Sequence, residues 1–339
     1  LKVGPASAGS VPGPACYGRG GTDATITDAY AVCGWLGSGE LGYGAVKLDL
    51  EAARAAVAAV GERAGMSLEE TAEAIIKVSI SGVFLEVSKL FSHQGADPRH
   101  FALLPFGGAG PMTACLLARD LGLKKILVPA APGVLAAFGG LISDTRNDFI
   151  RTVLRDVDTD AAAMLKTTAT ELEEQALHWL NEEQAHRGAS TLTFSGDMRY
   201  RGQSYEIEVP LERSWLSDGD VAAIARAFHD AHDRVYDFAD RNAECQIVNL
   251  RAVITGHVPK PKEQRSPVRE RAAAPSGNVQ VFLDGRWQAA GIYDRDKLEA
   301  GDWLVGPAII RQADCTTCVV DAFTASVDAA GNLVIAKEG

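Results

Sequence analysis

The sequence lacks several features that mark large classes of protein. Positive charge is outnumbered, because 33 Lys and Arg stand against 44 Asp and Glu and leave a net charge of −11. This balance argues against nucleic acid or an anionic membrane as the main partner. The most apolar run, residues 134–142, is far shorter than the roughly 20 residues that cross a bilayer, and no signal peptide opens the chain. These absences favour a cytoplasmic protein whose partners are other proteins and small molecules.

Cysteine is also scarce, and its distribution argues against a disulfide framework. The six cysteines lie mostly within apolar segments, which favours a reducing compartment. Cys315 and Cys318 have the spacing of half a zinc site, but no second pair of Cys or His follows them. They lie in a β-branched run, so we favour buried strand residues over metal ligands. His229 and His232 are three apart on a predicted helix, and we favour packing there too, because no third ligand is identifiable.

Two familiar phosphate-binding motifs are absent, yet one Gly-rich turn remains as a candidate. Neither the Gly-Lys-Ser/Thr of a P-loop nor the dinucleotide fingerprint surrounds it. A predicted buried strand, Phe101–Phe106, leads into this turn, and the apolar spacing from Met112 to Leu121 predicts a helix after it. The small residues let a ligand approach the backbone, and the unpaired N–H groups at the start of the helix favour an anion. We therefore predict a phosphate-bearing ligand at Gly107, Gly108, Ala109 and Gly110; the alternative is a turn that only connects.

The pattern of elements predicts an α/β fold. Lys125–Val128 is a second predicted strand, so strand, helix and strand should form a right-handed crossover in a parallel sheet. The length of 339 residues favours two domains, which we place at residues 1–155 and 156–339 because the pattern changes near residue 155. The other expected elements are helices at 24–36, 50–64, 67–93, 132–140, 159–187 and 220–236, strands at 149–154 and 246–257, a hairpin at 191–211, and short strands after a charged linker at 259–275.

Asp28 is the candidate catalytic carboxylate. The first 22 residues form a loop rich in Gly and Pro, and Thr27 or Asp28 then stands where a helix could begin. The structural interpretation of Asp28 is a helix cap, and the functional one is a carboxylate at a ligand cleft. Because the chain starts with Leu1 and a long irregular segment, we expect it to be one piece of something larger.

Several motifs, taken in order, closely resemble the hydantoinase A family. They are Ser7-Ala-Gly9, Pro12–Thr22, Thr25–Ala29, Phe106–Pro111, Ala131–Val134, Arg151-Thr152, Asp197–Glu206, Gly306–Ile310 and Gly331–Leu333. This family includes ATP-dependent N-methylhydantoinases and 5-oxoprolinases, and the ATP-consuming subunits of acetone and acetophenone carboxylases. The resemblance covers essentially the whole chain. It implies part of the actin-like ATPase fold shared with sugar kinases and heat-shock chaperones, followed by an α+β C-terminal domain.

The resemblance also implies a chemistry and a set of partners. ATP, usually with Mg²⁺, would be held at the Gly-rich turn and would phosphorylate the carbonyl oxygen of an amide or ketone substrate. Hydrolysis or carboxylation would follow at a hydantoinase B-type subunit. The two Asp-Gly-Gly-Thr loops of the family are not found here, so we expect the C-terminal half of a hydantoinase A-type subunit, completed by an N-terminal half and inactive alone. No metal ligand is assigned within this chain.

The same resemblance leaves three functions to weigh. Opening of a cyclic amide of the hydantoin or 5-oxoproline type is the first expectation, and carboxylation of a ketone is the alternative. A third possibility is a non-catalytic scaffold with a vestigial nucleotide site. It arises because Ser79–Val83 stands where the family usually has Ala-Asn-Ala-Asn-Met, and because Tyr30 replaces a usual Asn.

Overall fold

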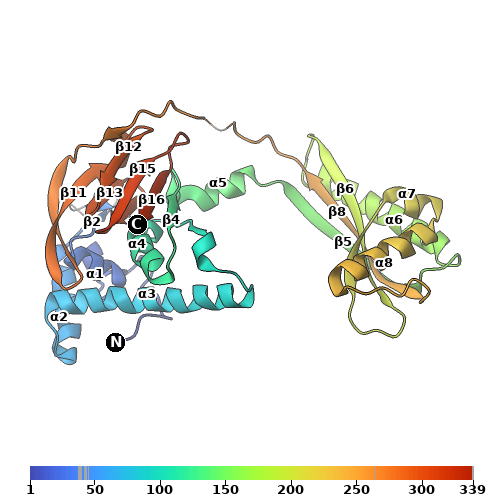
Figure 1. Ribbon diagram of the computed structural model, residues 1–339, viewed down its shortest axis with the longest axis horizontal. Helices are drawn as coiled ribbons and strands as arrows, with labels where there is room; N and C mark the ends of the chain where they lie inside the picture. Colours follow the sequence, from blue (N-terminus) through green and yellow to red (C-terminus); the bar gives the residue numbers. More distant parts are fainter. Residues whose placement is uncertain (37–39, 42–43, 45, 263, 338–339) are drawn as a thin grey trace. The chain divides into compact units, whose positions relative to one another are not determined.

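The chain forms two compact units in the computed structural model, which describes residues 1–36, 40–41, 44, 46–262 and 264–337 (Figure 1). The first unit comprises Leu1–Gly139 and Lys262–Gly339, and the second comprises Gly140–Pro261. These units do not follow a single division at residue 155, because the strands after Lys262 join the first unit. Among the described residues, no helix is both long enough and apolar enough to cross a membrane.

The helices of the first unit begin and end at local sequence signals. Its elements are α1 (Ile26–Val32), α2 (Leu50–Ala64), α3 (Leu68–His93), α4 (Gly110–Leu121), the start of α5 (Leu135–Ile142), and 3-10 turns at Ala15–Tyr17, Pro98–His100, Pro132–Val134 and Arg295–Lys297. The predicted capping box starts α3, where the Glu70 N–H donates to Ser67 Oγ and the Ser67 N–H donates to the Glu70 carboxylate. α3 packs against α1, α2 and α4 (Figure 1). The long α3 is therefore the base on which the other helices lie.

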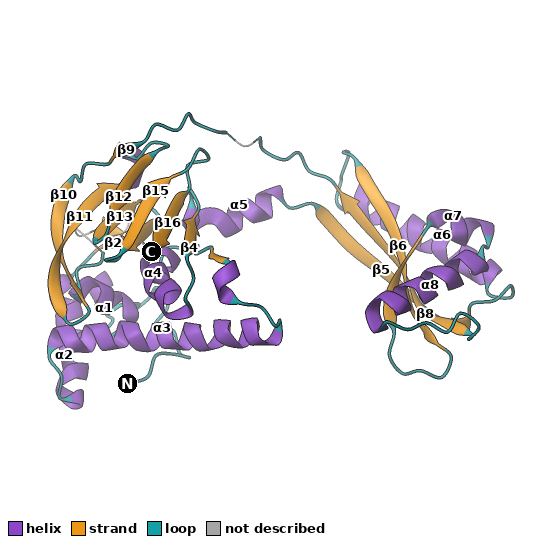
Figure 2. Ribbon diagram, viewed as in Figure 1, coloured by secondary structure: helices purple, strands orange, loops and turns teal. Residues whose placement is uncertain are grey.

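Two sheets complete the core of the first unit, on one side of its helices (Figure 2). The larger sheet has the order β3-β4-β16-β15-β12-β9, with bounds Ala102–Leu103, Lys125–Val128, Leu333–Lys337, Phe323–Val327, Asp302–Val305 and Arg271–Ala272. The smaller has the order β10-β11-β13-β14, with bounds Gly277–Leu283, Arg286–Asp294, Ala308–Gln312 and Cys315–Val319. A separate pair joins β1 (Glu40–Leu41) to β2 (Val46–Lys47). β3 and β4, which come before and after α4 in the sequence, pair in parallel as predicted. β16, near the end of the sequence, pairs antiparallel with β4 and extends the sheet.

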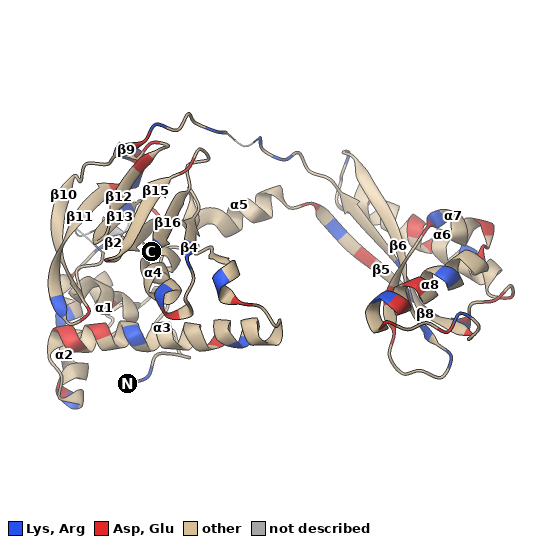
Figure 3. Ribbon diagram, in the orientation of Figure 1, with Lys and Arg blue, Asp and Glu red and all other residues tan. Residues whose placement is uncertain are grey.

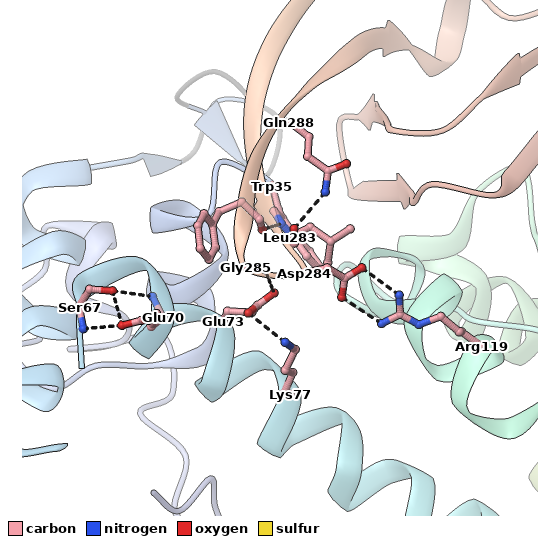
Figure 4. Close-up of polar contacts among 11 residues, drawn as sticks. Trp35, Ser67, Glu70, Glu73, Lys77, Arg119, Leu283, Asp284, Gly285 and Gln288 are labelled. Atoms are coloured by element: carbon pink, nitrogen blue, oxygen red, sulfur yellow. Dashed lines mark hydrogen bonds and ion pairs between the residues drawn. The ribbon is translucent and has the colours of Figure 1, made fainter. Parts of the chain in front are cut away.

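Polar contacts fasten the β10–β11 hairpin to the helical layer (Figure 4). At the hairpin turn, the Gly285 N–H donates to Glu73 Oε1 of α3 at 3.2 Å. The neighbouring Asp284 pairs with Arg119 of α4 at 3.1 Å between Oδ2 and Nη1. One sheet is thereby tied to both helices. This matters for function because α4 carries the Gly-rich turn at its start.

The second unit is an antiparallel sheet packed against helices. The sheet order is β5-β8-β6-β7, with bounds Thr145–Asp156, Cys245–Gly256, Ser190–Tyr200 and Ile207–Leu211. Its helices are α6 (Ala162–His178), α7 (Arg213–Asp218) and α8 (Val221–Tyr236). α6 packs against β5 and β8, and α8 packs against β7. Leu165, Leu172 and Phe228 are fully buried between these layers, so this unit has its own hydrophobic core, and the hairpin predicted at 191–211 is confirmed.

Three elements are shorter than the sequence suggested. The strand expected at Phe101–Phe106 is only the two residues of β3, because Pro105 has no N–H for the ladder. The helix expected to reach residue 187 leaves α-geometry after His178 and continues as a π-helix to Glu183. The helix expected at 24–36 is α1, and its cap is Thr25, whose extended backbone lets the side chain accept from the Asp28 N–H. Thr27 is thus inside the helix, and Asp28 completes the cap from the third helical position.

Candidate functional site

The candidate site lies at one edge of the larger sheet. Because β3 and β4 are parallel, the loops that follow them, residues 104–109 and 129–134, leave the sheet at the same edge. In open α/β sheets this is the edge where ligands bind. The Gly107 N–H donates to the Pro132 carbonyl at 2.7 Å and joins the two loops. This hydrogen bond holds the predicted Gly-rich turn against the loop that follows β4.

The Gly-rich turn has the backbone geometry of an anion site. Gly107 has φ +79°, in the left-handed region that favours glycine. Ala109 is the N-cap of α4 and supplies no side-chain cap. The N–H groups of Gly108 and Ala109 donate to no group within the described part of the chain. With the positive end of the α4 dipole, they are available to an anionic ligand.

A third loop reaches the same place and brings a carboxylate that the sequence analysis missed. It is the turn between β13 and β14, which contains Asp314. A Cβ on Gly108 would lie 3.3 Å from the Asp314 carbonyl oxygen, and a Cβ on Gly133 would lie 2.5 Å from Asp314 Oδ2. Asp314 Oδ1 is buried and has no hydrogen-bond partner among the described residues. The site thus combines backbone donors with one free acceptor.

The neighbour of Asp314 in the chain is chemically inert. Burial, with the charge of Asp314 as the next contribution, raises the pKa of the Cys315 thiol to about 12. Cys315 and Cys318 are both buried in β14, as predicted, and all six cysteines are free. A neutral buried thiol is a poor nucleophile and a poor metal ligand. The polar chemistry of this turn therefore rests on Asp314.

Asp28 lies elsewhere and is saturated with hydrogen bonds. Its side chain is fully buried and accepts from the N–H groups of Ala15, Cys16 and Thr25 at 3.2, 2.7 and 2.9 Å. It also accepts from Thr25 Oγ1 at 2.7 Å. Each carboxylate oxygen is thus engaged in fixing the first loop to α1. The catalytic role stays a prediction, and this placement favours the structural interpretation.

The two histidines also serve packing. His229 Nδ1 lies 3.0 Å from the Tyr200 hydroxyl, and His232 Nδ1 lies 2.6 Å from the Phe238 carbonyl oxygen. Both side chains are buried in the second unit. Within the described ranges, no group of three or more His, Cys, Asp and Glu side chains is placed to hold a metal ion.

A nucleotide fits the arrangement at the Gly-rich turn by its donors and its acceptor. The free N–H groups suit phosphate oxygens, which only accept hydrogen bonds. Asp314 Oδ1 suits a hydroxyl or amino group, which can donate. Sequence reasoning could not bring Asp314 to this site, because about 200 residues separate it from the turn along the chain. The only local signal is an Asp placed just before a β-branched strand.

Comparison with known proteins gives consistent matches along the whole chain. The hydantoinase/oxoprolinase family model matches residues 1–149, and the hydantoinase/oxoprolinase C-terminal domain model matches residues 153–334. An uncharacterised protein of Methanocaldococcus jannaschii is 35% identical over 337 residues, which are 99% of this chain and 48% of that protein. Caprolactamase subunit alpha of Pseudomonas jessenii is 31% identical over 337 residues, with coverage of 97% and 48%.

A solved structure supports the fold. Nucleotide-free acetone carboxylase, from a study of ATP-dependent acetone carboxylation, aligns with a TM-score of 0.87 at 25% identity. The alignment covers 99% of this chain and 49% of that chain. This likeness confirms the predicted α/β fold class. The chain spans about half the length of the curated relatives it matches.

Proposed function

Because the chain belongs to the hydantoinase/oxoprolinase family, we propose that it forms part of an enzyme that uses ATP to activate a carbonyl group. Relatives named for ATP-dependent reactions act on an amide in one case, caprolactamase, and on a ketone in the other, acetone. In both substrates the group to be activated is a carbonyl. The first reaction we propose is opening of a cyclic amide, with ketone carboxylation as the second candidate.

One observation carries the proposal: the loops after two parallel strands meet at a Gly-rich turn in which two backbone donors, the Gly108 and Ala109 N–H groups, have no acceptor among the described residues. The Gly108 and Ala109 N–H groups would hold phosphate oxygens, and α4 would orient them along its axis. ATP, with Mg²⁺ bound to its phosphates, supplies the phosphoryl group that makes the carbonyl oxygen a leaving group. This chain's part is to bind and position the nucleotide.

An exposed apolar surface supports the proposal that further protein is needed. The buried positions of α3 end at Ile80, and the apolar side chains after it, Val83, Leu85 and Leu90, are about half exposed. Phe101 is exposed to a similar degree, and its ring centroid lies 5.3 Å from that of Phe91. Because Val83 and Leu85 lie on different faces, this end of α3 exposes apolar side chains on more than one side, which is typical of a helix that other protein covers.

The partners we propose follow from that surface and from the relatives. We propose that an N-terminal half would cover the apolar surface on α3, since the matched relatives are about twice as long as this chain. The subunit designation of caprolactamase alpha supports an additional chain, which we propose to be of the hydantoinase B type. Without these partners we expect no turnover of ATP by this chain.

Nucleotide binding is tested by titrating ATP into the assembled protein and measuring the heat of binding by calorimetry. In Gly108→Val the side chain would enter the ligand space and press on the Asp314 carbonyl oxygen. We expect at least about tenfold weaker ATP binding, since a loss of about 1.4 kcal/mol corresponds to tenfold in affinity. The matched control is Gly277→Val in β10, where a new Cβ meets nothing within 4 Å. Equal ATP affinity in Gly108→Val and wild type would contradict a nucleotide at this turn.

The substrate test measures ADP release by the assembled protein with candidate carbonyl compounds. Stimulation by cyclic amides would support the hydrolase, and stimulation by ketones only in the presence of bicarbonate would support the carboxylase. A complex that binds no nucleotide and releases no ADP would favour the third possibility, a scaffold with a vestigial site, which Ser79–Val83 first suggested.

A further inference from the structure

Resting on the proposed nucleotide site, we propose that Asp314 is a nucleotide-binding residue that accepts hydrogen bonds from the ribose hydroxyls. Neither the Gly-rich turn nor the motifs quoted above for the family resemblance include this residue. The proposal depends on how its turn is held, on the unpaired carboxylate oxygen, and on the space that two glycines leave for it.

The turn that carries Asp314 is rigidly placed. β13 and β14 pair up to Gln312 and Cys315, so only Ala313 and Asp314 form the turn. The Gln312 Nε2 donates to the Ala130 carbonyl at 2.8 Å and anchors the turn to the loop after β4. This two-residue turn is held by the pairing of β13 with β14 and by the hydrogen bond from Gln312. The backbone that carries Asp314 therefore has little freedom. Asp314 is therefore preorganised beside the Gly-rich turn.

The glycine at position 133 is shaped to this side chain. A Cβ there would lie 2.5 Å from Asp314 Oδ2 and 2.7 Å from both Cβ and Cγ of Asp314. No positive φ requires glycine at this position. The requirement is steric, since any larger residue would push Asp314 out of place.

The unpaired oxygen indicates what kind of group binds. Asp314 Oδ1 is buried without a hydrogen-bond partner, and such a group costs free energy until a donor reaches it. Phosphate oxygens cannot be that donor, because they are acceptors and carry the same sign of charge. The donors of a nucleotide are the ribose hydroxyls and, on adenine, the amino group.

Position favours the ribose over the base. The Asp314 carbonyl oxygen lies against Gly108, within the turn proposed to hold phosphates. The ribose is joined directly to the phosphates, whereas the adenine amino group is at the far end of the molecule. Carboxylates pair with ribose hydroxyls in dinucleotide-binding folds by the same chemistry. We therefore assign the hydroxyls to Asp314.

The experiment measures binding of ATP, 2′-deoxy-ATP and 3′-deoxy-ATP to the assembled protein by calorimetry, with Mg²⁺ and again with EDTA. We expect wild type to bind ATP about tenfold more tightly than at least one deoxy analogue, as for a hydrogen bond to a charged acceptor. Asp314→Asn should weaken ATP binding about tenfold and remove the preference for ATP. The control is Asp321→Asn, an exposed aspartate whose carboxylate accepts from the Ala322 N–H, and it should bind as wild type does.

The outcomes separate this inference from the proposed function. If wild type binds no nucleotide, the proposed function fails. If wild type binds ATP and both deoxy analogues with equal affinity, the ribose assignment is overturned. This outcome is measured on wild type and does not depend on whether any variant folds. An effect of Asp314→Asn that is seen only with Mg²⁺ would also overturn it, because the carboxylate would then act through the metal.

Discussion

Two carboxylates in the first unit have opposite surroundings. Asp28 is fully buried and accepts four hydrogen bonds, three of them from backbone N–H groups. Asp314 has one buried oxygen with no partner in the described structure, beside a turn in which the Gly108 and Ala109 N–H groups also have no acceptor among the described residues. A saturated carboxylate holds its own chain together. An unsaturated one, placed at the carboxyl edge of parallel strands, is available to a ligand.

The difference also bears on the two interpretations of Asp28. It was a candidate either for a helix cap or for a carboxylate at a ligand cleft, and its catalytic role stays a prediction. Its hydrogen bonds to the loop at Ala15-Cys16 explain why an Asp is needed there on structural grounds. Burial, aided by Asp28, raises the pKa of the Cys16 thiol above its ordinary range. The Cys16 thiol beside Asp28 is accordingly neutral.

The largest effect is expected from Asp28→Asn. The amide would present a donor to backbone N–H groups that need an acceptor, and the charge that strengthens these bonds would be lost. We expect the free energy of unfolding to fall by about 3 kcal/mol, measured by urea denaturation at pH 7. The control is Asp49→Asn, the same substitution at the exposed N-cap of α2, where Asn caps equally well.

The same variant tests the comparison between the two carboxylates. Folded Asp28→Asn protein should bind ATP as wild type does, because Asp28 touches no part of the Gly-rich turn. Unchanged stability together with lost activity would reverse this assignment. Asp28 would then be the cleft carboxylate of the catalytic hypothesis.

A smaller effect is expected from Gly133→Ala. The added methyl group would meet the Asp314 side chain at 2.5–2.7 Å, and overpacking of this kind costs about 1–3 kcal/mol. Calorimetry should also show weaker ATP binding, since the carboxylate must move. Gly140→Ala, where the new Cβ meets nothing within 4 Å, should keep the ATP affinity of wild type and should not destabilise, because Ala is the better helix former within α5. Wild-type ATP affinity in Gly133→Ala would show that the position of Asp314 does not matter.

The sequence was sufficient for elements with strong local signals. α2 at Leu50–Ala64 and β4 at Lys125–Val128 have the predicted bounds. The Asp49 cap and Gly65 define the ends of α2, and Pro129 follows directly after β4. The parallel pairing of β3 and β4 followed from the strand, helix and strand order. α5 (Leu135–Ile142) was also expected, although this helix has no buried residue and no charged one (Figure 3).

What could not be predicted depends on contacts between distant parts of the chain. No local pattern shows that β16 pairs with β4, or that the β13–β14 turn lies against Gly108 and Gly133 in the loops of the candidate site. The Gly-rich turn was found because its residues are contiguous. Asp314 was missed because its role is defined by Gly108 and Gly133, which are far from it in sequence.

The smallest expected effect concerns a satisfied group in the second unit. His229 Nδ1 and the Tyr200 hydroxyl lie 3.0 Å apart, and this hydroxyl accepts from the Asp240 N–H. Burial, and next the charge of Arg241, lower the pKa of His229 below its ordinary value. In the unfolded chain the pKa of a histidine is about 6.5. Between this pKa and the lower pKa in the folded protein, the unfolded chain binds more protons than the folded one, so the free energy of unfolding falls as the pH drops.

Urea denaturation between pH 7.5 and 5 should therefore show wild type losing stability more steeply than His229→Gln, whose side chain does not titrate. The control is His178→Gln, because His178 is exposed in the last turn of α6 and should leave the wild-type slope unchanged. Parallel slopes for His229→Gln and wild type would mean that protonation of His229 is not resisted by the fold. Charging this buried side chain, which already has a hydrogen-bond partner, would then cost the fold nothing.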